Sequence, residues 1–249
     1  VRPETGIEDE SAASGERFTG RANIQDPALT NPIDDEKLTS YELGFKTAFL
    51  DNTVILNGAV YYSIYDDIQL TIPRGIQGRA AIVVTNAADA EIKGGELEVR
   101  ARVLPNLDLT GSLGVVNARY TKFDDPSNAF AKDRRLLATP NYTGNIAAAY
   151  LVPLGGMGDL RLRAEWAHRG SSGTDVVDSP ELRKGKNGEL DATITWAMAD
   201  GMTEIALFGN NIFDREYFVN GVNLGDSLGI AYRFYNAPRT YGIEVRRSF

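Results

Sequence analysis

The chain has 249 residues, no cysteine and a formal net charge of −8, from 34 acidic and 26 basic residues. Without cysteine it can form neither disulfides nor thiolate metal sites, and the acidic excess argues against nucleic-acid binding. The length suits one large β domain or two small ones. No apolar run approaches the ~18 residues that a transmembrane helix needs.

Residues 1–37 are polar and irregular, and we expect a loop that holds one short strand near residues 17–24. This segment has too few apolar side chains to build a core. Because the chain begins with Val1 rather than Met, we also expect its N-terminus to be internal to a longer protein or to be a processed end.

The first strongly periodic segment spans residues 38–50, where apolar side chains such as Phe45 alternate with polar ones. Strict alternation predicts a half-buried strand, and the Asp-Asn pair at residues 51–52 predicts a tight turn after it. A second strand is expected over residues 53–70, followed by a long polar connection over residues 70–87.

The third expected strand, residues 88–104, has the sharpest alternation in the chain. One face carries Leu97, Val99, Ala101 and Val103, and the other carries Glu96, Glu98, Arg100 and Arg102. Four charged positions in a row on one face cannot lie in an apolar core, so they need water or a wet interior. Before them lie Gly94 and Gly95, where we expect a β-bulge.

The rest of the chain repeats this pattern up to its last residue. Further alternating strands are expected over residues 107–121, 140–152, 159–169, 190–196, 203–213 and 241–249. Long polar connections are expected over residues 122–137, 170–187 and 214–238, and short turns separate the other pairs of strands. The final segment ends on an aromatic residue, Phe249, and its alternation fits either a membrane barrel or the last strand of a soluble sandwich.

Strand length and loop length together favour one architecture. Several of the nine expected strands are longer than the ~5–6 residues typical of globular domains. Short turns that alternate with long loops are typical of an all-β, transmembrane, antiparallel up-and-down β-barrel. The pattern leaves two alternatives open, a small passive porin or adhesin barrel and a soluble carbohydrate-binding β-sandwich.

Several segments, in this order and spacing, resemble the C-terminal half of TonB-dependent outer-membrane receptors. They are residues 40–46 (SYELGFK), 92–98 (IKGGELE), 139–140 (TP), 209–217 (GNNIFDREY) and 238–242 (PRTYG), with the strand that runs to Phe249. Residues 17–22 (RFTGRA) are similar to the iron–siderophore receptors of this family. The terminal strand, with Tyr241, Ile243, Val245 and Phe249, also resembles the assembly signal of outer-membrane barrels.

The resemblance implies a plugged barrel of about 22 strands in the bacterial outer membrane, of which this chain would contribute the last nine. Residues 1–37 would be an extracellular loop and residues 38–249 the C-terminal part of the barrel, without the plug domain. The implied function is import of a scarce solute, in particular a ferric–siderophore complex. The implied partners are outer-membrane lipid, the TonB–ExbB–ExbD energy-coupling system, the barrel-assembly machinery and a ferric chelate or other small ligand.

Two sets of side chains are candidates for function. The loop set offers fixed donors and flat surfaces for an anionic ligand and consists of Arg74, Arg79, Arg134, Arg135, His168, Arg169, Tyr232, Arg233 and Tyr235. The lumen set is expected to face a plug or a solute passage, or to neutralise itself as a polar wall. It consists of Glu96, Glu98, Arg100, Arg102, Arg161, Arg163 and Glu165.

Catalytic chemistry finds little support in the sequence. His168 is the only histidine, and the chain contains no Gly-x-Ser-x-Gly motif. We therefore predict neither an enzyme nor a cofactor or metal site.

Overall fold

The computed structural model describes residues 33–76, 79–123, 134–174, 180–224 and 229–249. The strands are β1 (Lys37–Phe49), β2 (Val54–Ile76), β3 (Arg79–Leu104), β4 (Leu107–Phe123), β5 (Tyr142–Pro153), β6 (Asp159–Arg169), β7 (Asn187–Ala197), β8 (Thr203–Asn210), β9 (Phe218–Leu224), β10 (Ile230–Tyr235) and β11 (Thr240–Arg247). Two short 3-10 helices, η1 (Gly155–Met157) and η2 (Pro180–Leu182), lie in the connections. Within the described residues, no helix is both long and apolar enough to cross a membrane.

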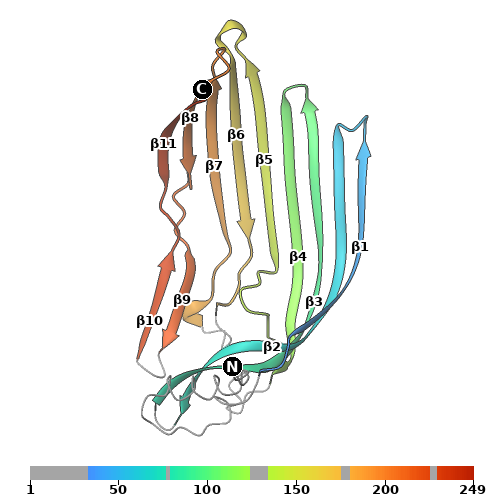
Figure 1. The fold of residues 1–249 in the computed structure, drawn as a ribbon, viewed down its shortest axis with the longest axis vertical. Helices are drawn as coiled ribbons and strands as arrows, with labels where there is room; N and C mark the ends of the chain where they lie inside the picture. Colours follow the sequence, from blue (N-terminus) through green and yellow to red (C-terminus); the bar gives the residue numbers. More distant parts are fainter. Residues whose placement is uncertain (1–32, 77–78, 124–133, 175–179, 225–228) are drawn as a thin grey trace, which may run out of the picture.

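Nine of the strands form one curved antiparallel sheet in the order β1-β2-β3-β4-β5-β6-β7-β8-β11 (Figure 1). Each strand pairs with the strand that follows it along the chain, except that β8 pairs with β11 across the separate β9–β10 hairpin. The short turns gather at one end of the sheet and the longer connections at the other (Figure 1). This up-and-down arrangement confirms the predicted all-β fold and the nine wall strands. It leaves no second packed sheet among the described strands, so the soluble-sandwich alternative is wrong.

The register keeps the two faces of the sheet chemically distinct. Leu97 pairs with Gly58 on one side and Leu113 on the other, whereas Glu98 pairs with Asn57 and Ser112. The apolar face exposes large side chains, among them Leu43, Phe45, Leu97, Val99, Leu113, Ile146, Ile194, Leu207 and Ile243. A continuous apolar surface of this extent is unsuited to water. It matches the lipid-facing side of a barrel wall.

Aromatic residues bound this apolar face at a constant spacing. On β1 and β5, two outward aromatic positions lie eight residues apart: Tyr41 and Phe49, and Tyr142 and Tyr150. The same spacing separates Tyr241 on β11 from Phe249, which lies two residues beyond that strand. Eight residues span about 27 Å along a strand. A tilt of about 40° shortens this to about 21 Å, close to the ~25 Å apolar band between the two aromatic girdles of a membrane barrel.

The two faces give a direct test by site-specific labelling. Spin labels at Leu97, Val99 and Leu162 should be accessible to a lipid-soluble quencher, because these side chains share the apolar face. Labels at Glu98 and Arg163 should respond to an aqueous quencher instead. Accessibility parameters from continuous-wave spin resonance measure this difference, and equal protection of both sets would contradict the assigned faces.

Local hydrogen bonds fix the short turns. At the predicted turn after β1, Leu50, Asp51 and Asn52 all adopt positive φ, and the Thr53 hydroxyl donates to the Leu50 carbonyl at 2.7 Å. Between β7 and β8 the Asp200 carboxylate accepts hydrogen bonds from the Thr203 hydroxyl and from the backbone N–H groups of Met202 and Thr203. These bonds lower the pKa of Asp200 to about 2 because they stabilise its charged form.

The expected loop at residues 70–87 is wrong, because β2 and β3 continue through it as one long hairpin. Bulges near residues 65–68 and 89–90 break the regular pairing, and the hairpin bends there across the end of the sheet (Figure 1). Gly94 and Gly95, where we expected a bulge, pair in regular register on both sides. The bend therefore lies several residues beyond the glycines.

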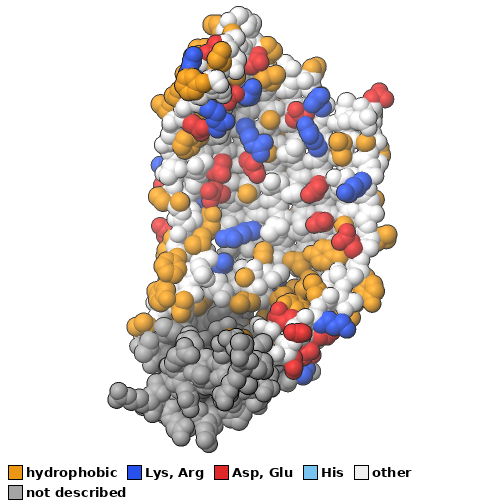
Figure 2. Space-filling view, viewed as in Figure 1, with side chains coloured by type: hydrophobic (Ala, Val, Ile, Leu, Met, Phe, Trp, Pro, Cys, Tyr) orange, Lys and Arg blue, Asp and Glu red, His pale blue; other side chains and the backbone are white. Residues whose placement is uncertain are grey.

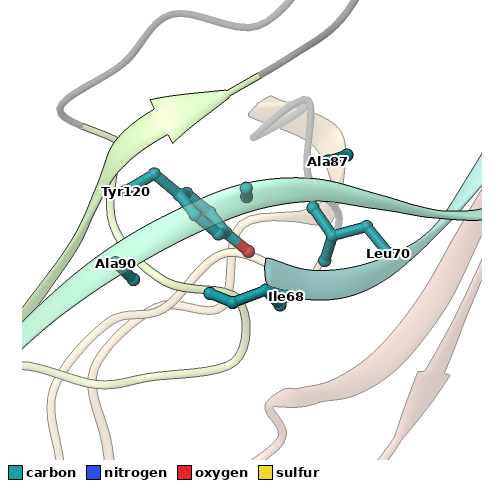
Figure 3. Packing of buried hydrophobic residues seen from close by; sticks show 6 residues of the cluster. Ile68, Leu70, Ala87, Ala90 and Tyr120 are labelled. Atoms are coloured by element: carbon teal, nitrogen blue, oxygen red, sulfur yellow. The ribbon is translucent and has the colours of Figure 1, made fainter. Parts of the chain in front are cut away.

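A small apolar cluster packs where this hairpin bends (Figure 3). Its buried members are Ile68, Leu70, Ala87, Ala88, Ala90 and Tyr120. The preceding segment is tied to the same place, since the Glu36 carboxylate accepts hydrogen bonds from the Tyr65 hydroxyl at 2.9 Å and the Gln69 N–H at 2.7 Å. Leu70 and Ala87, at the two ends of the expected loop, thus belong to this cluster together with residues of the flanking strands.

Other boundaries also differ from the sequence-based ones. The expected connection at residues 214–238 contains the β9–β10 hairpin, and β8 ends at Asn210 instead of residue 213. The terminal strand ends at Arg247, two residues before the chain end. The strand expected near residues 17–24, and most of the loop expected at residues 1–37, lie outside the described residues.

Candidate functional site

The loop candidates come from four connections at the long-loop end of the sheet. Arg74 and Arg79 belong to the outermost part of the β2–β3 hairpin, where the backbone of Arg74 pairs with Ala81 and that of Arg79 with Ile76. Arg134 and Arg135 lie beside the end of β4: the Arg134 carbonyl accepts the Tyr120 N–H at 2.9 Å, and Arg135 bridges to Arg119. The fold therefore gathers candidates far apart in sequence at one end of the wall.

The three candidates near residue 233 lie on strand β10, not in a loop. All six residues of β10 are exposed. Tyr232 pairs with Val222 and packs edge-on against Phe234 at a centroid distance of 5.4 Å. The Arg233 guanidinium points to the other face, 5.6 Å from the Phe218 ring centroid. β10 thus presents an aromatic side and a basic side.

His168 and Arg169 are neighbours in sequence but lie on opposite faces of β6. His168 pairs with Gly144 and Gly188 in the apolar register, and its ring stacks between Tyr142 at 5.5 Å and Trp166 at 6.5 Å. Because this is the outward face, we leave His168 out of the ligand site. Arg169 shares the inward register with Arg163 and Glu165.

Arg169 belongs to a polar cluster on the inward face at the long-loop end of the sheet. We call this end the mouth and the cluster of Arg169, Lys184, Glu189 and Tyr217 the mouth cluster. The Arg169 guanidinium lies 5.6 Å from the Tyr217 ring centroid, and the Tyr217 hydroxyl donates to the Glu189 carboxylate at 2.6 Å. Burial, then the hydrogen bond and charge of Glu189, raise the pKa of Tyr217 to about 12. Burial, assisted by the charge of Arg169, lowers the pKa of Lys184 nearby. The cluster combines cationic, phenolic and carboxylate groups within one side of the mouth.

Two asparagines position Tyr217, Asn211 within the segment 209–217 and Asn236 after β10. Asn211 is buried, and its side chain donates to the Arg215 and Ala237 carbonyls and accepts the Arg215 N–H at 2.9 Å. Asn236 accepts the Tyr217 N–H at 2.9 Å. The hydrogen bonds of the buried Asn211 and the partly exposed Asn236 hold two chain segments together. Residues 209–217, one of the segments that resemble the family, therefore have a structural role: they hold the backbone on which Tyr217 of the mouth cluster lies.

The lumen candidates all lie in the inward register, and the face turned to the viewer in Figure 2 carries acidic and basic side chains over the middle of the sheet. Arg163 bonds Glu165 at 2.7 Å, Arg161 bonds Glu204 at 2.9 Å, and Arg102 bonds Asp108 at 3.2 Å. Glu96 and Glu98 line an open hollow of about 550 Å³, and the Arg100 backbone pairs with Ile55 and Thr110. Contact of these residues with a plug stays a prediction.

The terminal-strand candidates face outward. Tyr241, Ile243 and Val245 are 67%, 70% and 65% exposed, and β11 pairs with β8 through the registers Tyr241 with Gly209 and Ile243 with Leu207. Phe249 lies beyond the end of the strand and is fully exposed. This outward apolar row is the surface expected of an assembly signal, and its recognition stays a prediction.

Sequence reasoning missed Tyr217, Glu189 and Lys184. The alternation along β7 places Glu189 with Asp191 on the inward face, so the sequence pattern could have identified Glu189. Tyr217 and Lys184 gave no such signal, because each lies outside the regular strands and reaches Arg169 or its surroundings only through the fold.

Comparison with known proteins agrees with this architecture. The family model described as "TonB dependent receptor-like, beta-barrel" matches residues 9–212. The ferrichrome outer membrane transporter/phage receptor of Escherichia coli (strain K12) is 26% identical over 196 residues, 78% of this chain and 25% of its own length. The ferric-pyoverdine 358 receptor of Pseudomonas putida is 25% identical over 232 residues, 88% of this chain and 25% of its own. The chain thus spans about a quarter of these relatives.

A solved structure shows the same fold. The ferric yersiniabactin uptake receptor FyuA from Yersinia pestis superposes with a TM-score of 0.71 and 25% identity, covering 86% of this chain and 30% of that one. The family match covers most of the chain, and the wall, its two faces and its turns agree with a membrane barrel. The chain therefore belongs to the TonB-dependent receptor family of outer-membrane β-barrels.

Proposed function

We propose that the chain is the last nine strands of the barrel of a receptor that imports a ferric siderophore or a similar chelate across the outer membrane. The relatives named above support this substrate class. Energy would come from the TonB–ExbB–ExbD system through parts of the receptor outside these strands. The barrel-assembly machinery would insert the protein, with the terminal strand as its signal.

The mouth cluster is the observation that supports ligand binding best. Arg169 lies over the ring of Tyr217, whose hydroxyl is bonded to Glu189, and Arg233 lies on the exposed β10 strand. Arginine offers a fixed array of donors to anionic oxygen atoms, and aromatic rings offer flat contact surfaces. A compact anionic chelate with aromatic or amide groups suits both features.

Uptake assays with arginine variants test the proposal. We expect Arg169→Ala and Arg233→Ala each to weaken binding of the cognate ferric chelate by about 10- to 100-fold. The reason is that a lost hydrogen bond to a charged group costs roughly 1.5–3 kcal/mol. The measurement is transport of radioactive iron by cells that express the complete receptor, with hydroxamate, catecholate and phenolate siderophores at subsaturating concentration.

Arg246→Ala is the matched control, because Arg246 is an exposed arginine bonded to Glu244 near the short-turn end. It should leave uptake unchanged. Normal uptake of every siderophore by both mouth variants would contradict a ligand role for the mouth. Uptake that survives loss of TonB would instead support the passive-porin alternative.

A further inference from the structure

The long β2–β3 hairpin turns inward where it leaves the sheet. We call its outer part, residues 68–76 and 79–88, the arm. Ala90 and Tyr120 share the inward register of the lumen set, and both are buried, with exposed fractions of 1% and 2%. They pack against the buried side chains of the arm, which are Ile68, Leu70, Ala87 and Ala88 (Figure 3). The arm therefore covers part of the inward face at the mouth.

Hydrogen bonds at the base of the arm tie it to the segment before β1. The Asn86 side chain accepts the Asp34 N–H at 2.8 Å and donates to the carbonyl groups of Asp34 at 2.8 Å and Asp67 at 2.6 Å. The Glu36 carboxylate accepts the Gln69 N–H at 2.7 Å. We call these five residues the clamp. A two-stranded hairpin has little stability of its own in water, so the clamp and the apolar cluster set the position of the arm.

The β4–β5 connection joins the arm to the mouth cluster. Leu136 packs against the apolar cluster at the base of the arm. Two residues further along, the Ala138 N–H donates to the Gly173 carbonyl at 3.0 Å, and Ser172 exchanges two backbone hydrogen bonds with Lys184, at 3.1 and 2.8 Å. Lys184 belongs to the mouth cluster. A continuous series of contacts thus runs from the clamp to this cluster.

The backbone of Ala138 indicates that the connection is firmly held. Its φ is 56°, a left-handed conformation that is unfavourable for a residue with a Cβ atom. Such a conformation persists where its surroundings fix it. Here the packing of Leu136 fixes the chain before Ala138, and the bond to Gly173 fixes Ala138 itself. The connection can therefore transmit a displacement of the arm.

We propose that Glu36 and Asn86 are positioning residues for the mouth. They hold the arm inward, and the β4–β5 connection passes the position of the arm on to Lys184. Neither residue has to touch the imported solute. An effect on import rests on the ligand site proposed above, whereas the coupling between the clamp and Lys184 is a property of the fold, carried by contiguous contacts.

A distance measurement between two spin labels tests the clamp. The labels are attached after Val84→Cys on the arm and Arg246→Cys on β11, because both side chains are exposed. The chain has no cysteine of its own, and any cysteine elsewhere in the complete receptor is replaced by serine. Pulsed spin resonance should give one narrow distance distribution. Asn86→Ala removes three hydrogen bonds and should at least double the width of this distribution.

Hydrogen exchange in the complete receptor tests the coupling. Asn86→Ala should raise the exchange rate of the Lys184 N–H at least fivefold, because the bond from this group to Ser172 depends on the position of the connection. Leu136→Ala interrupts the series of contacts but leaves the clamp intact. It should therefore raise exchange at Lys184 by a similar factor while the spin-label distribution stays narrow. Mass spectrometry with residue-level fragmentation measures the rates.

Asp200→Ala is the matched control, because Asp200 also accepts three hydrogen bonds but lies at the short-turn end. It should leave both readouts unchanged, and all variants should keep normal heat-modifiable mobility. A distance distribution that stays narrow in both Asn86→Ala and Glu36→Ala would overturn the clamp. Unchanged exchange at Lys184 despite a displaced arm would overturn the coupling. Neither readout involves a chelate, so uptake by Arg169→Ala tests the proposed function separately.

Discussion

Gly94→Val is expected to reduce the amount of folded receptor in the outer membrane at least tenfold. A Cβ atom at Gly94 would overlap the Tyr61 ring and lie 2.8 Å from the Val115 carbonyl oxygen on the neighbouring strand. The carbonyl belongs to the β3–β4 ladder and cannot withdraw without breaking it. Overpacking of this kind costs roughly 1–3 kcal/mol or more, and a valine adds two further methyl groups. Heat-modifiable gel mobility of membrane fractions measures the folded amount.

The adjacent glycine provides the control. A Cβ atom at Gly95 would lie 3.2 Å from the Ala59 carbonyl oxygen and 3.4 Å from a Val60 methyl group, which a small shift relieves. Gly95→Ala should therefore keep at least half of the folded receptor. If Gly94→Val folds as well as Gly95→Ala, the close packing of Tyr61 across Gly94 is not a constraint on the wall.

The second large effect concerns the edges of the sheet. Among the described strands, β1 and β11 have one neighbour each. Every backbone N–H or C=O left unpaired in hydrocarbon costs several kcal/mol. We therefore expect the 249-residue chain expressed alone to aggregate or to be degraded, and the same strands within a complete receptor to insert.

Refolding into detergent, followed by heat-shifted gel mobility and single-channel recording, measures this difference. The complete receptor, refolded in parallel, is the positive control for the procedure. A stable, heat-modifiable monomer of defined conductance from the isolated chain would contradict the expectation. It would also favour a small self-contained barrel.

The two faces of the wall follow from sequence alone. A period of two separates Glu96, Glu98, Arg100 and Arg102 from Leu97 and Val99, and a shift of one residue would bury all four charges. The same parity places His168 outward and Arg169 inward. Their shared position at a strand end made both loop candidates, but the parity separates them. Which side of the sheet a side chain takes is a local property of its strand, so it can be predicted without knowing the neighbouring strands.

Which residues meet at the mouth was decided by the tertiary structure. The alternation predicts a strand that ends at residue 70, and only the pairing of residues 71–76 with residues 79–84 extends β2 and β3 beyond it. Arg169 meets Tyr217 because the buried Asn211 and the partly exposed Asn236 hold the segments near residues 211 and 236 together. The sequence by itself determined the nine strands of the wall, their two faces and the family resemblance, but not the β9–β10 hairpin or the extension of β2 and β3. The fold decided the binding surface, because register and contact between distant segments depend on long-range hydrogen bonds and packing that no local pattern encodes.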